Sequence, residues 1–118
     1  MALTLTPEML EGAYEFLRVT PPFKRWKLPH ADEVEFVVGN SPNCCGWYTA
    51  GETAKHRIMI SARNIGHTVS LMATMAHEMI HLHQCHAKRE TRNAEHNAAF
   101  LRAAALVCKY HGFDPKLF

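Results

Sequence analysis

The sequence predicts a small α+β domain with an N-terminal helix, a three-stranded sheet and two long helices. Three observations support this class. Apolar residues recur at helical spacing near the start, strand-forming residues dominate three short segments between 33 and 61, and helical periodicity returns from about Val69. Strands followed by a run of helices are typical of α+β proteins. At 118 residues the chain has the length of one domain, and we assign residues 1–118 to it.

The first helix has clear start and stop signals. Thr6 can serve as the N-cap, Pro7 occupies the first helical position, and Glu8 places an acidic group in the first turn. The sequence TPP at 20–22 ends the helix, because proline cannot continue its hydrogen-bond ladder. The apolar face comprises Met9, Leu10, Ala13, Phe16 and Leu17.

Three segments are predicted as strands: EVEFVV at 33–38, WYTA at 47–50 and HRIMIS at 56–61. The turn GETAK, 51–55, between the last two predicts a hairpin. If the segment 56–61 forms an edge strand, it offers free backbone groups to an extended substrate. We expect the segment to lie at such an edge.

The C-terminal half predicts two long helices. The first covers about 69–87 and the second about 94–110, and the polar segment KRETRN at 88–93 separates them. Gly112 is the expected C-cap of the second helix, since glycine readily adopts the left-handed conformation found there.

Composition narrows the class of protein. A hydrophobic fraction of 47% and a formal charge of +2 indicate an ordinary globular protein and do not by themselves indicate nucleic-acid binding. No window has the length of apolar sequence that a membrane span needs, and the N-terminus does not resemble a signal peptide. The four cysteines form no C-x-x-C pair, which argues against a zinc ribbon or a thioredoxin-like redox motif. With neither a signal peptide nor a membrane span expected, we predict reduced thiols and a cytoplasmic location.

Histidine is concentrated in MATMAHEMIHLHQCHAKRE, residues 72–90. On a helix, His77 and His81 lie about 40° apart on one face and one turn along, where two imidazoles can bind the same ion. His83 and His86 fall on the opposite side and are expected to be exposed. Glu78 lies beside the ligand face and can reach a metal-bound water as a general base.

The pattern His77-Glu78-x-x-His81 is the H-E-x-x-H spacing of zinc peptidases. The alternative is a pair of histidines that merely form hydrogen bonds in a core. The apolar flanks argue against it, because a carboxylate there is costly without a compensating metal. A third ligand is also needed, and spacing alone leaves both His96 and His111 open, since an antiparallel helix could bring either end alongside the motif.

MAHEMIH followed by HNAAF resembles the SprT-like zinc metallopeptidase domain, which includes the Spartan-type proteases. That family carries a third histidine in an H-G-x-x-F/W element, and His96 and Phe100 match it while Asn97 replaces the glycine. CGWY at 45–48 and IMIS at 58–61 fit the upstream order, so the resemblance covers about residues 33–113. It implies a zincin-like fold and Zn²⁺.

The resemblance implies His77, His81 and His96 as zinc ligands and Glu78 as the catalytic base of a peptidase that acts on a protein or peptide. Many relatives carry a C-terminal zinc ribbon or DNA-binding extension, and we expect a catalytic core alone here. Two alternatives stay open: a metallopeptidase-like regulator that cleaves a repressor, and a non-catalytic binding module that keeps zinc for structure. Oligomeric state is not predicted.

Other roles are left open at this point. The candidate oxyanion donors are Tyr48, Tyr110 and His111, and the candidate partners of His96 are Asn93, Glu95 and Asn97. The basic segments KRWK, 24–27, and KRETR, 88–92, suit either solvated loops, which we favour, or contact with DNA phosphates. Cys85 is expected to be a packed thiol. His30, His56 and His67 have no expected partner.

Overall fold

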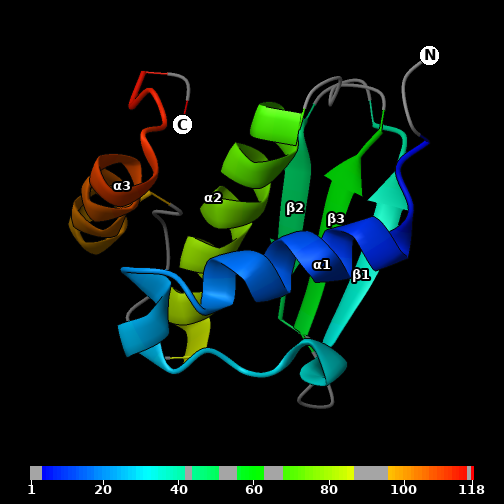
Figure 1. Ribbon diagram of the computed structural model, residues 1–118, viewed down its shortest axis with the longest axis horizontal. Coiled ribbons are helices and arrows are strands. Elements are labelled where there is room, and N and C mark those ends of the chain that lie inside the picture. The colour runs from blue at the N-terminus through cyan, green and yellow to red at the C-terminus, as the bar shows by residue number, and fades with distance from the viewer. Residues whose placement is uncertain (1–3, 42–43, 51–55, 63–67, 87–95, 117) are drawn as a thin grey trace.

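The structure is a computed structural model in which three α-helices and a three-stranded sheet are described (Figure 1). It describes residues 4–41, 44–50, 56–62, 68–86, 96–116 and 118. The class is therefore α+β, as the sequence predicts. Assignment of residues 1–118 to a single domain stays a prediction.

The first helix, α1 (Pro7–Arg18), confirms its predicted start and stop. The Thr6 hydroxyl accepts a hydrogen bond from the Met9 amide at 3.3 Å, which satisfies one of the donors that a helix start leaves open. The helix ends just before the TPP sequence. Its buried residues are Leu10, Ala13, Tyr14 and Leu17.

The segment after α1 contains two short 3₁₀ helices that the sequence analysis did not predict, η1 (Phe23–Trp26) and η2 (Ala31–Glu33). Side chains of α1 hold this segment in place. The Tyr14 hydroxyl donates to the Pro29 carbonyl at 2.6 Å, and Glu15 accepts from the Ala31 amide at 2.9 Å. The connector is thereby tied along α1 before the first strand begins.

The sheet consists of β1 (Val34–Gly39), β2 (Gly46–Thr49) and β3 (His56–Ser61), in the order β1-β3-β2. β2 and β3 are antiparallel, so the predicted hairpin pairing is confirmed, whereas β1 and β3 are parallel. The expectation that 56–61 forms an edge is wrong. β3 lies at the centre with both sides of its backbone paired, and the edges of the sheet are β1 and β2.

The helices are layered on one side of the sheet (Figure 1). α1 crosses the strands and contacts β1, while α2 (Thr68–His86) contacts β2, β3 and α1. α3 (Ala98–His111) packs against α2. Ile58 and Ile60 of β3 are fully buried beneath the helices, whereas Trp47, on the other face, is 55% exposed. The sheet thus has one covered face and one open face.

The bounds of α2 agree with the prediction within one residue, but those of α3 do not. α3 begins at Ala98 because the Asn97 side chain accepts from the Phe100 amide at 2.9 Å and caps the helix there. His96 therefore lies in the turn before α3 and not within it. Gly112, with φ 76°, is the C-cap, as expected. In the described part of the chain, every helix is too short or too polar to span a bilayer.

Candidate metal centre

Helix α2 places His77 and His81 on one face, as the spacing predicts. Their ring centroids are 5.1 Å apart, and both residues are half-buried. The rest of the helix is anchored by its apolar residues, of which Met75, Met79 and Ile80 are fully inaccessible to solvent. Because those side chains hold α2 against the rest of the core, the two imidazoles are held on a rigid element.

His96 joins this pair from the turn before α3. Its ring centroid lies 5.1 Å from that of His77 and 5.1 Å from that of His81. One nitrogen of each of the three rings lies within 4.8 Å of the other two, close enough for one metal ion to bind all three. His96 is exposed, so the cluster opens to solvent on that side. Of the two third-ligand candidates, the structure brings His96 to the motif.

Two contacts explain why His96 is placed there. Gln84 of α2, only 2% exposed, donates to the Asn97 side-chain oxygen at 3.2 Å, so the start of α3 is tied to α2 directly beside His96. Phe100, one turn into α3, packs its ring against the cluster, with centroid distances of 4.6 Å to His81 and 4.5 Å to His96. Of the three expected partners of His96, the structure describes Asn97, which fixes the backbone beside His96 by capping α3 and bonding Gln84. Asn93 and Glu95 lie outside the described residues.

A fourth group at the cluster was not foreseen from the sequence. The Nδ1 atom of His77 lies 2.9 Å from the main-chain oxygen of Phe118. The ring of Phe118 also lies 5.5 Å from the imidazole, centroid to centroid. No sequence signal marks this contact, because a carbonyl group is present at every residue and these two residues are 41 positions apart.

Burial favours the neutral form of His77 and of His81, because it lowers the pKa of each imidazole. Burial is the main cause that lowers the pKa of His77, and repulsion from His96 adds to it, while the hydrogen bond to Phe118 opposes it. Burial, with repulsion from His77 and His96, lowers the pKa of His81 to about 4. A neutral imidazole keeps a nitrogen lone pair available, which is the form that binds metal.

Glu78 lies on the sheet side of the helix, 5% exposed. A Cβ added at Gly46 of β2 would lie 3.1 Å from the Glu78 carboxylate oxygen Oε2 and 2.9 Å from Thr74 Cγ2. The carboxylate is therefore held between α2 and β2, out of bulk solvent, and the absence of a side chain at Gly46 makes room for it.

Several other predicted candidates are engaged elsewhere. The His111 Nε2 atom lies 3.1 Å from the Thr20 hydroxyl, and the Tyr48 hydroxyl lies 2.7 Å from His56 Nδ1, so His56 has a partner after all. The expectation that His83 is exposed is wrong. Its ring is half-buried and stacks on Trp26 at a centroid distance of 4.2 Å, because η1 covers that side of α2.

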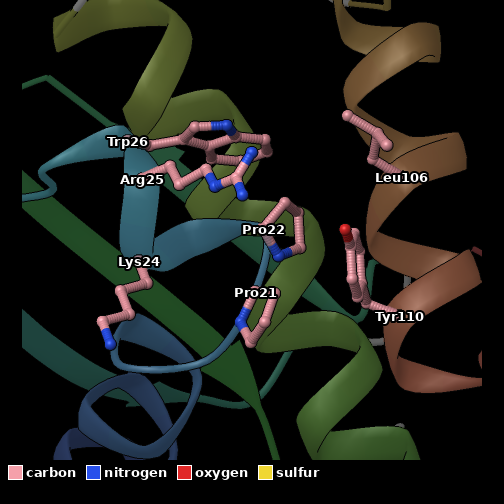
Figure 2. Close-up of a pocket in the computed structure, with 7 residues that line it drawn as sticks. All are labelled: Pro21, Pro22, Lys24, Arg25, Trp26, Leu106 and Tyr110. Carbon is pink, nitrogen blue, oxygen red and sulfur yellow. The ribbon is translucent and has the colours of Figure 1, made fainter.

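Tyr110 and three residues of the basic segment, Lys24, Arg25 and Trp26, line a surface pocket of about 670 Å³ between η1 and α3 (Figure 2). Arg25 and Trp26 lie on the η1 side, and Leu106 and Tyr110 on the α3 side, whereas Lys24 points away. None of the three clustered histidines lines this pocket. An oxyanion donor is expected beside the metal-binding histidines, whereas Tyr110 faces a pocket that none of them lines.

Some candidates lie outside the described residues: His67, the segment 88–92 and the side chain of His86. Cys85 is half-buried with a free thiol, and His30 is exposed. Comparison of the chain with protein-family models, curated proteins and solved structures finds no match. The resemblance to the SprT-like domain therefore stays a prediction from the sequence motifs.

Proposed function

We propose that this chain is a zinc-dependent peptidase with a zincin-like site of the SprT-like type. The supporting observation is the convergence of His77, His81 and His96, whose ligand atoms lie within 4.8 Å of one another. A buried carboxylate, Glu78, follows the first of these histidines directly. The combination is a three-ligand site with an adjacent general base.

The donor set fits zinc. Three neutral imidazole nitrogens from three histidines match the three-histidine pattern of catalytic zinc, which leaves a fourth position for water. Because the ligands carry no negative charge, the full charge of the dication acts on its remaining partner. Zinc bound here would supply an acidified water and a Lewis acid for the scissile carbonyl.

The protein's own part in the reaction is proton transfer and positioning. Glu78 accepts the proton of the attacking water at its carboxylate and returns it to the amine that leaves, so the carboxylate is regenerated. Its burial against Gly46 holds it in place between α2 and β2. β2 is an edge strand beside α2, and an extended peptide can pair with such an edge.

The decisive experiment is Glu78→Gln, which preserves size and removes the base. We expect the variant to keep one zinc per chain by elemental analysis and to lose peptide hydrolysis by at least about 100-fold. The measurement is cleavage of a fluorescently labelled unstructured protein by the zinc-loaded chain. If wild type and Glu78→Gln both bind zinc and cleave equally, the enzyme proposal is wrong. If neither cleaves any of several unstructured substrates, the zinc-containing binding module is favoured.

DNA-associated proteins are proposed as a substrate class on narrower grounds. Lys24 and Arg25 are exposed beside Trp26, a composition that suits phosphates and bases. However, one face of the Trp26 ring already stacks on His83. Binding to single-stranded DNA that weakens steeply with salt would support this class, and binding that ignores salt would count against it. A repressor-cleaving regulator shares the same site and differs only in substrate.

A further inference from the structure

The last residues of the chain return to the metal-binding cluster. Gly112, in the left-handed conformation, ends α3 and turns the chain back. Phe113 then stacks on His111 at 5.7 Å and on Phe118 at 5.8 Å, centroid to centroid. In Figure 1 the chain after α3 bends back toward the gap between α3 and α2. We call residues 113–116 and Phe118 the C-terminal strap.

The contact at the end of the strap has a defined hydrogen-bond direction. The Phe118 main-chain oxygen can only accept, so at 2.9 Å the His77 Nδ1 atom must carry the hydrogen and donate it. In a neutral imidazole the second nitrogen, Nε2, then holds the lone pair. A free neutral histidine prefers the opposite tautomer, with its hydrogen on Nε2, so this contact selects the less common form.

We propose that Phe118 is a positioning residue for the metal centre: its main-chain oxygen holds His77 in the Nδ1–H tautomer and presents Nε2 to the ion. The inference rests on the metal-binding role proposed above and deepens it. Metal-binding histidines commonly donate their other ring hydrogen to a carbonyl or carboxylate, and loss of that partner weakens metal affinity 10- to 100-fold. Here the partner comes from the strap.

The hydrogen bond to Phe118 distinguishes His77 from the other two histidines of the cluster. Of the three clustered histidines, His77 alone has a ring nitrogen with a hydrogen-bond partner among the described residues. Phe100, by comparison, makes ring contacts with all three imidazoles. Because stacking does not distinguish one ring nitrogen from the other, the strap supplies the tautomer selection that packing alone cannot.

The strap is anchored by two aromatic contacts. The Phe118 ring packs on His77 at 5.5 Å and on Phe113 at 5.8 Å, so these rings fix the place of the main-chain oxygen. α3 is thereby joined to the cluster at both ends, through His96 before its start and through the strap after its end. A change in the strap is expected to reach the metal centre without any change in the ligands.

The test compares the full chain with a chain truncated after Pro115, and uses Lys116→Ala as the matched control. Lys116 is exposed, and its replacement by alanine keeps Phe118 in the chain. The first readout is the tautomer of His77 in metal-free, ¹⁵N-labelled protein, read from the ring nitrogen shifts. The second is zinc affinity by competition with a chelator. We expect the Nδ1–H tautomer in the full chain and in Lys116→Ala, and a loss of about tenfold or more in zinc affinity on truncation.

The outcomes separate cleanly. An Nε2–H tautomer in the full chain overturns the inference, whether or not the truncated chain folds. Unchanged zinc affinity in a folded truncated chain overturns it as well. Phe118→Ala, which keeps the main-chain oxygen but removes the ring contacts, should weaken zinc binding less than truncation does. A full chain with the Nδ1–H tautomer, strap-dependent zinc affinity and no peptidase activity supports this inference and contradicts the proposed function alone.

Discussion

Individual side chains in the cluster are tuned by where they are buried. His81 is half-buried among other imidazoles, and its pKa is lowered to about 4. Protons therefore compete with a metal less at His81 than at an exposed imidazole, whose pKa is about 6.5. The same burial that weakens the charged form of His81 keeps its lone pair available near neutral pH.

This pKa shift predicts a pH dependence of stability in the metal-free protein. The unfolded chain binds a proton at His81 near pH 6.5, whereas the folded chain does so only near pH 4. As pH falls between these values, the free energy of unfolding should fall by up to about 1.4 kcal/mol per pH unit, and above pH 7 the contribution is constant. Urea unfolding at pH 7.5 and 5 checks this. His81→Gln should show a shallower dependence, and an unaltered slope would contradict the assignment.

Gly46 is the second residue whose effect can be isolated. Alanine there places a Cβ 2.9 Å from Thr74 Cγ2 and 3.1 Å from the Glu78 carboxylate, so Thr74 must shift and the carboxylate must give by a few tenths of an ångström. We expect Gly46→Ala to lower peptide hydrolysis at least about tenfold, since small displacements of a catalytic group reduce rates strongly. Zinc content should stay that of wild type.

The matched control is Gly12→Ala, because no atom lies within 4 Å of the added Cβ and the residue is inside α1. Alanine stabilises a helix interior by up to about 1 kcal/mol over glycine, so this variant should be fully active and slightly more stable. Hydrolysis assays and urea unfolding of both variants are the measurements. Wild-type activity in Gly46→Ala would show that Glu78 does not depend on this packing.

At the scale of elements, the junction between α2 and α3 determines where His96 lies. Asn97 performs two tasks there: its oxygen caps α3 by accepting from the Phe100 amide, and it accepts from Gln84 of α2. Asn97 is thus the residue that joins the two helices.

We expect Asn97→Ala to destabilise the metal-free protein by about 1–2 kcal/mol, because the cap is lost and buried Gln84 loses a partner. Zinc affinity should weaken as well, since His96 is the adjacent residue. Asn97→Asp keeps the accepting oxygen at the helix start and should behave close to wild type. Urea unfolding measures the stability of both variants, and zinc competition measures their affinity. If the alanine and aspartate variants are equally stable, the Asn97 cap does not stabilise the protein.

Across the whole molecule, one ion would join α2 to the turn before α3 and so couple metal binding to folding. Zinc at 100 times its dissociation constant should raise the free energy of unfolding by about 2.7 kcal/mol, and a chelator should remove this gain. His96→Ala should abolish most of the zinc-dependent gain. His30→Ala is the control, because His30 is exposed and lies outside the cluster, so its response to zinc should match wild type. Thermal unfolding with zinc and with chelator distinguishes these cases.

Features that depend on neighbouring residues could be predicted from the sequence, whereas contacts between distant residues could not. His77 and His81 could be paired correctly because helical periodicity is local, and α1 could be bounded because Thr6 and the prolines act on adjacent residues. The start of α3 was placed four residues early because the capping role of Asn97 was not recognised. The contact from Phe118 could not be foreseen, since it joins residues that only the finished fold brings together.

The strand order β1-β3-β2 has a consequence for how this protein emerges from the ribosome. β3 is synthesised last of the three, yet it supplies the backbone partner of both β1 and β2. Until Ser61 has left the exit tunnel, neither earlier strand has its native neighbour. Nascent chains arrested before β3 should therefore be sensitive to added protease over residues 34–49, and should gain resistance abruptly once β3 and then α2 are available.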